Sequence, residues 1–196
     1  MSGFLSKEYI ESEMRVWAEM IKGYVPQTAF RIDPAKGKIR VLDIGCGPLP
    51  LEALVFRDLF ESNIDFTGID NGFELMDLIK ELYPELTFIH NDARKLNELI
   101  QGEVDIILNS NVQMKHPMGN WDKDTEYILR TMPKVHRQGG LVLHTFYSEI
   151  KANVAKGLLE PNYCIDYCEQ NKYWNLPKSD LPRHKFVLVG TRKCQP

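Results

Sequence analysis

Two glycines and three carboxylates stand where a chain of alternating strands and helices could bind a small charged molecule. Gly45 and Gly47 follow a short apolar run, and glycine lets backbone amides approach a ligand where a side chain would collide. The helix expected after this turn directs its N-terminal amides, and the positive end of its dipole, at an electron-rich group. Because a purely structural strand-to-helix turn has a similar composition, the glycines alone leave both interpretations open.

Acidic residues strengthen the ligand-binding interpretation, because one of them stands at each of three successive expected strand ends. Asp43 lies just before the glycines, Asp70 ends the second expected strand, and Asp92 follows the third. A carboxylate at the end of the second strand can accept hydrogen bonds from both hydroxyls of a ribose, and it disfavours a 2′-phosphate. At Asp92, either the carboxylate or the neighbouring backbone could meet an adenine edge. A single Asp is commonly a solvated residue or a helix N-cap, whereas three in register with a glycine turn indicate a nucleoside-binding site.

The apolar pattern supplies a framework in which such strand ends meet at one edge. Short apolar runs alternate with stripes at helical spacing, which predicts right-handed crossovers and a mainly parallel sheet covered on both faces. The strands are expected at 39–44, 64–69, 86–89, 104–108 and 141–146, and the helices at about 6–23, from 50 onward, through 75–82, near 96–100 and at 128–135. Two later strand-like runs, 163–168 and 186–191, would pair as an antiparallel edge hairpin.

Composition indicates one ordinary globular unit. The chain has 196 residues, 43% of them hydrophobic and 26% charged, with a net charge of −3. This balance argues against a disordered chain and offers no general electrostatic argument for nucleic-acid binding. The apolar stretches are too short and too charged to span a bilayer, the amino terminus lacks a secretory pattern, and the four dispersed cysteines are typical of reduced thiols. These features predict a cytoplasmic protein that does not associate with a membrane.

Five ordered segments resemble the motifs of class I S-adenosylmethionine-dependent methyltransferases, and the strand-one pattern apolar-Asp-apolar-Gly-x-Gly is the most specific of them. The segments are VLDIGCGPLPLE (41–52), FTGIDNG (66–72), FIHNDARKL (88–96), VDIILNSN (104–111) and VHRQGGLVLHTF (135–146). The resemblance implies a Rossmann-like, doubly wound α/β fold. Its mainly parallel seven-stranded sheet has the order 3-2-1-4-5-7-6, with strand seven antiparallel and helices on both faces. It also implies a single domain over 1–196, in which 1–37 form a helix and connector that cover the site, 38–146 the cofactor-binding core, and 147–196 a C-terminal helix and edge hairpin.

The resemblance further implies which residues contact the cofactor S-adenosyl-L-methionine, whose product is S-adenosyl-L-homocysteine. The implied contacts are Asp43, Gly45, Cys46 and Gly47 around the methionine portion, Asp70 and Asn71 at the ribose, Asp92 and Ala93 at the adenine, and Asn109 near the sulfonium and the substrate. The chain departs from the family at Leu49, which stands between two prolines where a third glycine is usual. It also lacks, after Asn109, the Pro-Pro-aromatic signature of enzymes that methylate amino groups of nucleic acids.

Methyl transfer is an in-line displacement at a carbon that already carries a good leaving group, so the protein mainly aligns two reactants and excludes water. A base is needed only when the acceptor carries a proton, and the sequence therefore leaves the catalytic residue undefined. His116 is the candidate proton acceptor, although an ordinary loop histidine is an equal alternative, and Asn111 and Tyr147 are further candidates for facing the substrate. His144 lies inside an apolar strand and is interpreted as a satisfied core histidine. The dispersed histidines and cysteines predict no metal site.

We therefore expect a methyltransferase that acts on a small-molecule acceptor, with three alternatives left open. Methylation of RNA or protein draws its support from the basic and aromatic residues of 172–196. A methyltransferase-like protein without activity could bind only the cofactor or a partner. A nicotinamide-dependent oxidoreductase is disfavoured, because the G-x-G-x-x-G fingerprint ends here in Pro50. The sequence leaves the oligomeric state open.

Overall fold

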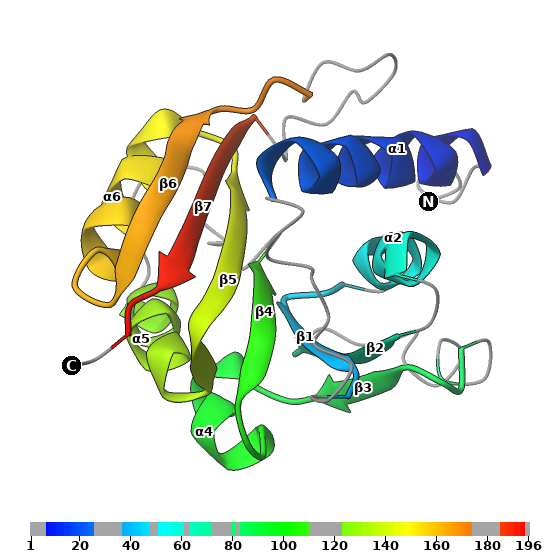
Figure 1. Cartoon of the computed structure of the whole chain (residues 1–196), viewed down its shortest axis with the longest axis horizontal. Helices are drawn as coiled ribbons and strands as arrows, with labels where there is room; N and C mark the ends of the chain where they lie inside the picture. The colour runs from blue at the N-terminus through cyan, green and yellow to red at the C-terminus, as the bar shows by residue number, and fades with distance from the viewer. Residues whose placement is uncertain are drawn as a thin grey trace.

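A seven-stranded sheet carries helices on both of its faces (Figure 1). The computed structural model describes residues 7–25, 37–47, 51–60, 63–71, 80, 83–109, 123–173 and 185–194. The strands are β1 (Ile39–Ile44), β2 (Ile64–Asp70), β3 (Thr87–His90), β4 (Val104–Asn109), β5 (His136–Phe146), β6 (Tyr163–Gln170) and β7 (Phe186–Arg192). The helices are α1 (Lys7–Tyr24), α2 (Leu51–Phe60), α4 (Leu96–Leu99), α5 (Lys123–Thr131) and α6 (Glu149–Leu159), with 3-10 turns η3 (Ala93–Lys95) and η4 (Met132–Lys134).

The strand order is β3-β2-β1-β4-β5-β7-β6, as expected from the family resemblance. Strands β1 to β5 pair in parallel, whereas β7 runs antiparallel to both β5 and β6. The chain moves outward from β1 to β3 in one direction and then returns to place β4 on the other side of β1. The carboxyl ends of β1 and β4 therefore meet at the point where the strand order reverses, which is the usual location of a ligand site in such a sheet.

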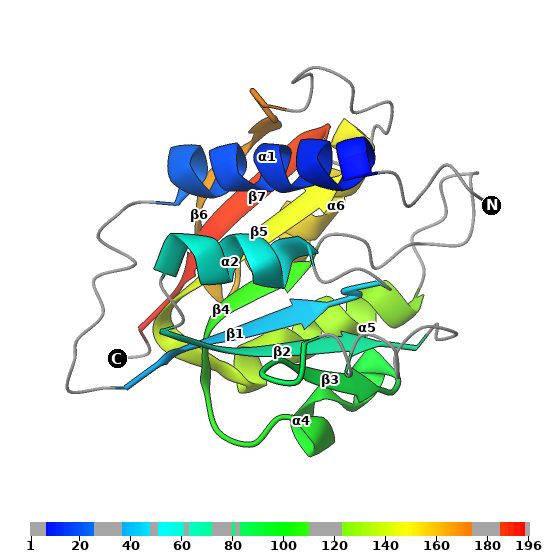
Figure 2. The same ribbon diagram turned by 90° about the vertical axis from the view of Figure 1, so that its right-hand side faces the viewer.

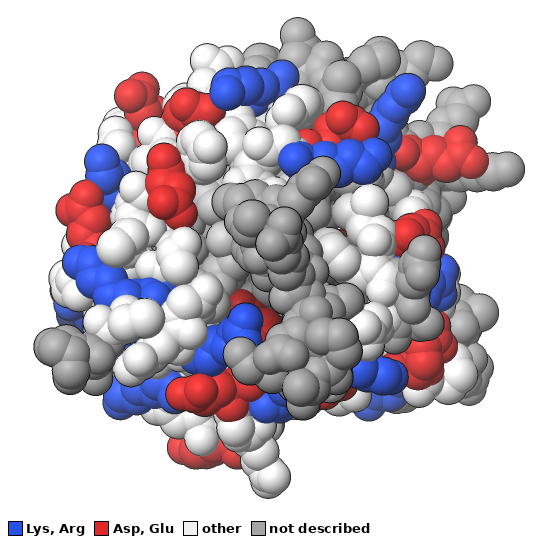
Figure 3. Space-filling model, in the orientation of Figure 1, with Lys and Arg blue, Asp and Glu red and all other residues white. Residues whose placement is uncertain are grey.

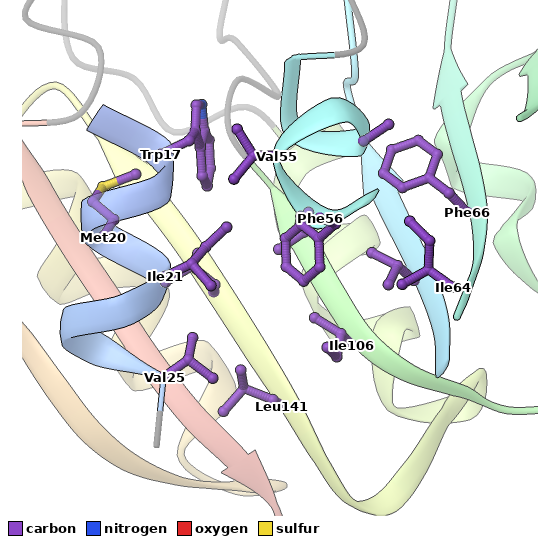
Figure 4. Close-up of a cluster of buried hydrophobic side chains, with 14 of the residues drawn as sticks. Trp17, Met20, Ile21, Val25, Val55, Phe56, Ile64, Phe66, Ile106 and Leu141 are labelled. Atoms are coloured by element: carbon purple, nitrogen blue, oxygen red, sulfur yellow. The ribbon is translucent and has the colours of Figure 1, made fainter. Parts of the chain in front are cut away.

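Two apolar clusters hold the helices on the sheet. Helices α1 and α2 lie side by side over one face, and α4, α5 and α6 cover the other (Figure 2). On the first face, Trp17 of α1 points toward Val55 of α2, while Val25 lies beside Leu141 of β5 (Figure 4). Burying a side chain of this size contributes about 1.5–3 kcal/mol, so α1 is held by its apolar stripe. Among the described helices, none is long and apolar enough to cross a bilayer.

The carboxyl-terminal end of α1 is fixed to the hairpin that ends the sheet. The ring of Tyr24 meets those of Tyr167 and Tyr173 edge to face, with centroids 5.4 and 5.8 Å apart. The Tyr24 hydroxyl accepts a hydrogen bond of 3.0 Å from the Lys172 amide. Gly23 makes this approach possible, because a Cβ there would lie 2.2 Å from the Tyr173 hydroxyl oxygen. The amino-terminal helix and the last hairpin therefore form one packed unit.

Strand β5 begins earlier than the apolar pattern indicates. The glycine pair at 139–140 predicts a turn before the strand, yet β5 already begins at His136. A Cβ on Gly140 would lie 2.5 Å from His136 Nε2 and 2.8 Å from the Asp105 carbonyl oxygen. The missing side chain at Gly140 is therefore what lets the strand pass a histidine ring and continue.

Other boundaries differ less. The helix expected at 128–135 begins at Lys123 and ends at Thr131, because Pro133 interrupts it within η4. The C-terminal helix is α6, which begins after Ser148, whose hydroxyl accepts a hydrogen bond from the Lys151 amide. Of the helix expected through 75–82, only Lys80 lies among the described residues.

Candidate functional site

The turn after β1 holds two glycines in a backbone conformation that other residues rarely adopt. Gly45 has φ 76° and Gly47 has φ 65°. The Gly45 amide donates to the Ile69 carbonyl of β2 at 2.7 Å, which fixes the turn to the neighbouring strand. A Cβ on Gly47 would meet nothing within 4 Å, so glycine is required there by the backbone and leaves open space beside it.

Asp70 lies directly beside this turn. Its Oδ2 accepts a hydrogen bond of 2.8 Å from the Gly47 amide, and its carbonyl accepts one of 3.0 Å from the Asn91 amide. The end of β2 is thereby connected to the glycine turn on one side and to the end of β3 on the other. The neighbouring Asn71 is exposed. The structure thus brings together the glycines and the carboxylate that the sequence places 23 residues apart.

Asp43 is the most unusual group of the site. Its side chain is fully buried, and neither carboxylate oxygen has a hydrogen-bond partner among the described residues. Burial, followed by the nearby carboxylates of Glu52 and Asp70, holds the pKa of Asp43 well above its usual range. A buried carboxyl group without a donor is destabilising, and a positively charged ligand would relieve this. Sequence reasoning missed Glu52, although an acidic residue in the first turn of the helix after the glycines was a usable signal.

Cys46 lies between the two glycines, but its side chain belongs to the apolar core beneath the turn. Burial, with the neighbouring carboxylates, raises the pKa of this thiol far above its usual value. Its sulfur fills the space above Gly68 of β2, where a Cβ would lie 2.8 Å from Sγ. Cys46 can therefore offer a ligand its backbone, and Gly68, which sequence reasoning did not single out, provides the space that its sulfur occupies in the core.

Asp92 and Ala93 follow β3 at the start of η3. Asp92 caps this turn, since its Oδ1 accepts a hydrogen bond of 2.8 Å from the Arg94 amide. The Arg94 side chain also binds the carboxylate, with Nε 2.7 Å from Oδ2, and lowers the pKa of Asp92. Nη2 of Arg94 also donates to Oδ2, so the two side-chain donors share one carboxylate oxygen. Arg94, which the sequence did not indicate, is thus the principal partner of Asp92.

Asn109 and His144 meet at the carboxyl ends of β4 and β5. Their Cα atoms are register partners, and both side chains are buried. The His144 ring stacks on Phe146, with centroids 5.9 Å apart. Its Nε2 has no hydrogen-bond partner in the described part of the chain, and burial lowers the pKa of His144 to about 3. The interpretation of His144 as a satisfied core histidine is therefore wrong for this nitrogen.

The remaining candidates are placed only in part. Tyr147 is half-buried and directly follows β5. Asn111, His116 and Leu49 lie outside the described residues. Within the residues that are described, no group of three or more His, Cys, Asp or Glu side chains has the arrangement of a metal site.

Comparison with known proteins identifies the family. A family model described as a methyltransferase domain matches residues 41–140, which is half of the chain. No curated protein matches the sequence. The candidate site residues at the carboxyl ends of β1 to β4 lie within the segment that the family model matches.

Solved structures show the same fold at low sequence identity. A TehB-like SAM-dependent methyltransferase from Corynebacterium glutamicum is 15% identical with a TM-score of 0.56, covering 97% of this chain and 100% of that one. An rRNA methylase from Streptococcus thermophilus is 11% identical with a TM-score of 0.57, covering 94% and 96%. Aeropyrum pernix fibrillarin, crystallised with natively bound S-adenosyl-L-methionine, is 16% identical with a TM-score of 0.62, covering 90% and 76%. The chain belongs to the methyltransferase-domain family and is an S-adenosylmethionine-dependent methyltransferase.

Proposed function

We propose that this enzyme transfers its methyl group to a small-molecule acceptor. The observation that carries the proposal is the acidic character of the site: the carboxylates of Glu52 and Asp70 lie close to Asp43, and, after burial, they are the causes that raise the pKa of Asp43. A site with this charge repels a polyanion, and the chain as a whole carries a net charge of −3. On the face shown in Figure 3, the described Lys and Arg residues alternate with Asp and Glu and form no continuous basic surface.

The residues of the site fit the proposed cofactor. When bound, S-adenosylmethionine supplies a methyl group on a positively charged sulfonium. The unpartnered carboxylate of Asp43 would stabilise the positively charged methionine end, and the open space beside Gly47 leaves room for a ligand to approach the turn. Asp70, which already accepts from the Gly47 amide, would also bind the ribose hydroxyls beside Asn71. In this arrangement Asn109 would lie near the sulfonium and the acceptor, and Asp92 and Ala93 would lie near the adenine of the cofactor.

The described residues favour catalysis by positioning. Holding two reactants in line can lower a barrier by about 7–11 kcal/mol without any proton transfer. The buried histidine at the end of β5 stays neutral at physiological pH, because burial lowers the pKa of His144 to about 3. His144 and Asn109 therefore offer an acceptor neutral hydrogen-bonding groups and no charge. His116, Asn111 and Tyr147 remain candidates for contacting that acceptor.

The cofactor assignment is tested by calorimetry with S-adenosylhomocysteine. We expect binding by the wild-type protein and no binding of NAD. If NAD binds while S-adenosylhomocysteine does not, the assignment is wrong.

The acceptor class is tested with methyl-tritiated S-adenosylmethionine and a cell extract separated into metabolites, RNA and protein. We expect label in the metabolite fraction. Label confined to RNA or protein would instead support a macromolecular acceptor. A protein that binds S-adenosylhomocysteine but labels none of the three fractions would be a cofactor-binding protein without activity.

A further inference from the structure

Asp43 is enclosed by parts of the sheet that offer its carboxyl group no polar partner. Its side chain is fully buried, and its register partners are Gly68 of β2 and Leu108 of β4, which carry no polar side chain. Neither of its carboxylate oxygens accepts a hydrogen bond from the described residues. A buried carboxylate without a donor or a cation is strongly destabilised, and such a group commonly takes up a proton instead.

The nearest charged groups to Asp43 are themselves acidic. Glu52 belongs to the first turn of α2 and is buried, and Asp70 ends β2 with its Oδ2 on the Gly47 amide. Burial first, then Glu52 and then Asp70 raise the pKa of Asp43. The negative charges around Asp43 therefore act in the same direction as its burial, and both favour the neutral carboxyl group.

The described residues supply no positive charge in return. Burial, with the same carboxylates, raises the pKa of the Cys46 thiol far above its usual value, so this neighbour stays protonated. Strand β4 has no charged residue at its carboxyl end, and Arg15 and Lys22 of α1, the other helix on this face, are exposed. Within the described part of the chain, a proton is the remaining means of neutralising Asp43 in the empty enzyme.

The ligand of this site brings the missing positive charge. S-adenosylmethionine and S-adenosylhomocysteine both end in an ammonium group, and the open space beside Gly47 lets a ligand approach the turn. A cation next to a carboxylate lowers its pKa, which opposes the effects of burial and of acidic neighbours. Ligand binding and loss of the proton should therefore be linked, so that each favours the other.

Resting on the proposed cofactor site, we infer that Glu52 is a positioning residue that keeps Asp43 protonated until the cofactor binds. When the ammonium group arrives, the O–H bond of the Asp43 carboxyl group breaks, the proton passes to water, and the carboxylate pairs with the ammonium. The ligand thus takes the place of a proton. Cofactor affinity then rises with pH over the range in which the empty enzyme holds that proton.

The test counts the protons released on binding. Calorimetry is carried out between about pH 5.5 and 7.5 in phosphate and in Tris, whose ionisation enthalpies differ, so the difference in binding heat gives the number of protons. The ligands are S-adenosylhomocysteine and 5′-methylthioadenosine, which lacks the amino-acid end. The proteins are wild type, Glu52→Gln and the control Asp58→Asn, since Asp58 is an acidic residue of α2 whose side chain is 62% exposed.

Wild type and Asp58→Asn should release up to about one proton with S-adenosylhomocysteine, and their affinity should rise by up to about tenfold per pH unit. Release with 5′-methylthioadenosine should be close to none, because this ligand has no ammonium group. In Glu52→Gln a neutral amide replaces the carboxylate, so release should fall below about half and the affinity should depend less on pH. A merely structural defect would lower affinity equally at every pH.

Three outcomes would overturn the inference. Equal binding heats in the two buffers across the pH range, with wild type, would mean that no proton is exchanged. Undiminished release in Glu52→Gln would mean that Glu52 does not control the proton. Undiminished release in Asp43→Asn would assign the proton to the ammonium group of the ligand. If wild type does not bind S-adenosylhomocysteine in either buffer, the cofactor site itself is misplaced, which differs from binding without proton release.

Discussion

Two buried histidines on the same strand have opposite surroundings. His136, at the amino end of β5, has partners for both ring nitrogens: Nδ1 lies 3.0 Å from the Tyr163 hydroxyl and Nε2 lies 3.3 Å from the Asp105 carbonyl oxygen. His144, at the carboxyl end, has no partner for Nε2 among the described residues. Both rings are almost completely buried, with exposed fractions of 2% and 1%. The difference therefore lies in hydrogen bonding and not in burial.

The same contrast extends beyond the histidines. At the amino end, Asp105 Oδ2 accepts a hydrogen bond of 2.7 Å from the Arg40 amide. At the carboxyl end, the buried carboxylate of Asp43 accepts none from the described residues. Unsatisfied polar groups are rare in native proteins and are typically found where a ligand completes them. Arg192 Nε at the amino end also lacks a hydrogen-bond partner among the described residues, so the contrast is limited to these two histidines and two aspartates. We infer that His136 and Asp105 stabilise the fold, whereas Asp43 and His144 are arranged for a bound molecule.

The largest expected effect is at the carboxyl end, in Asp70→Ala. This change removes the acceptor of the Gly47 amide together with the proposed ribose contact. Since each hydrogen bond to a charged group is worth about 1.5–3 kcal/mol, affinity for S-adenosylhomocysteine should fall by about 100-fold or more. Asp65→Ala, on the exposed part of the same strand, is the control and should bind normally in calorimetry. Unchanged affinity in Asp70→Ala would show that the ribose assignment is wrong.

Stability should depend on pH through the buried histidines. Burial lowers the pKa of His136 to about 4, below the value of about 6.5 for an unfolded histidine. Between these values the unfolded chain binds more protons, so the free energy of unfolding should decrease as the pH falls from about 6.5 towards 4. We expect a loss of about 2–3 kcal/mol from His136, measured by urea denaturation across this range. His136→Phe should have a shallower dependence, and an equally steep one would exclude His136 as the source.

At neutral pH, His136→Phe should destabilise the fold by about 1–3 kcal/mol, because it leaves the Tyr163 hydroxyl and the Asp105 carbonyl without their partner. The double variant His136→Phe with Tyr163→Phe removes both members of one hydrogen bond. It should therefore lose less than the sum of the single variants in urea denaturation. Additive losses would mean that the two side chains do not interact.

The smallest expected effect is in His144→Phe, which should not lower the stability of the fold as His136→Phe does. Phenylalanine has no ring nitrogen to leave unsatisfied and keeps the stacking on Phe146. The free energy of unfolding should therefore stay the same or rise by at most about 1 kcal/mol, which a thermal melt would show as an unchanged or higher melting temperature. A loss comparable to that of His136→Phe would remove the contrast between the two ends of β5.

The sheet could be predicted from the sequence because its signals are local. Apolar runs, a glycine turn and acidic strand ends occur within short segments, and together they indicated a mainly parallel sheet and the edge at which Asp43 and Asp70 lie. The strand order came from the family resemblance. The features that escaped prediction depend on contacts between distant segments. The space that Gly140 provides for His136, and the bridge from Asp92 through Arg94 to Asp124, exist only after β4, β5 and α5 have been brought together.

The position of the cysteines offers a practical route to following ligand binding. Cys46 is protonated and enclosed beneath the glycine turn, whereas Cys164 and Cys194 are exposed. Cys164 is the second residue of β6 and Cys194 follows β7, so both lie at the amino end of the sheet, away from the proposed site. A maleimide dye should therefore label these two positions, react more slowly with the half-buried Cys168 of β6, and spare the turn. The labelled enzyme would report ligand-induced changes by fluorescence while its binding residues stay unmodified.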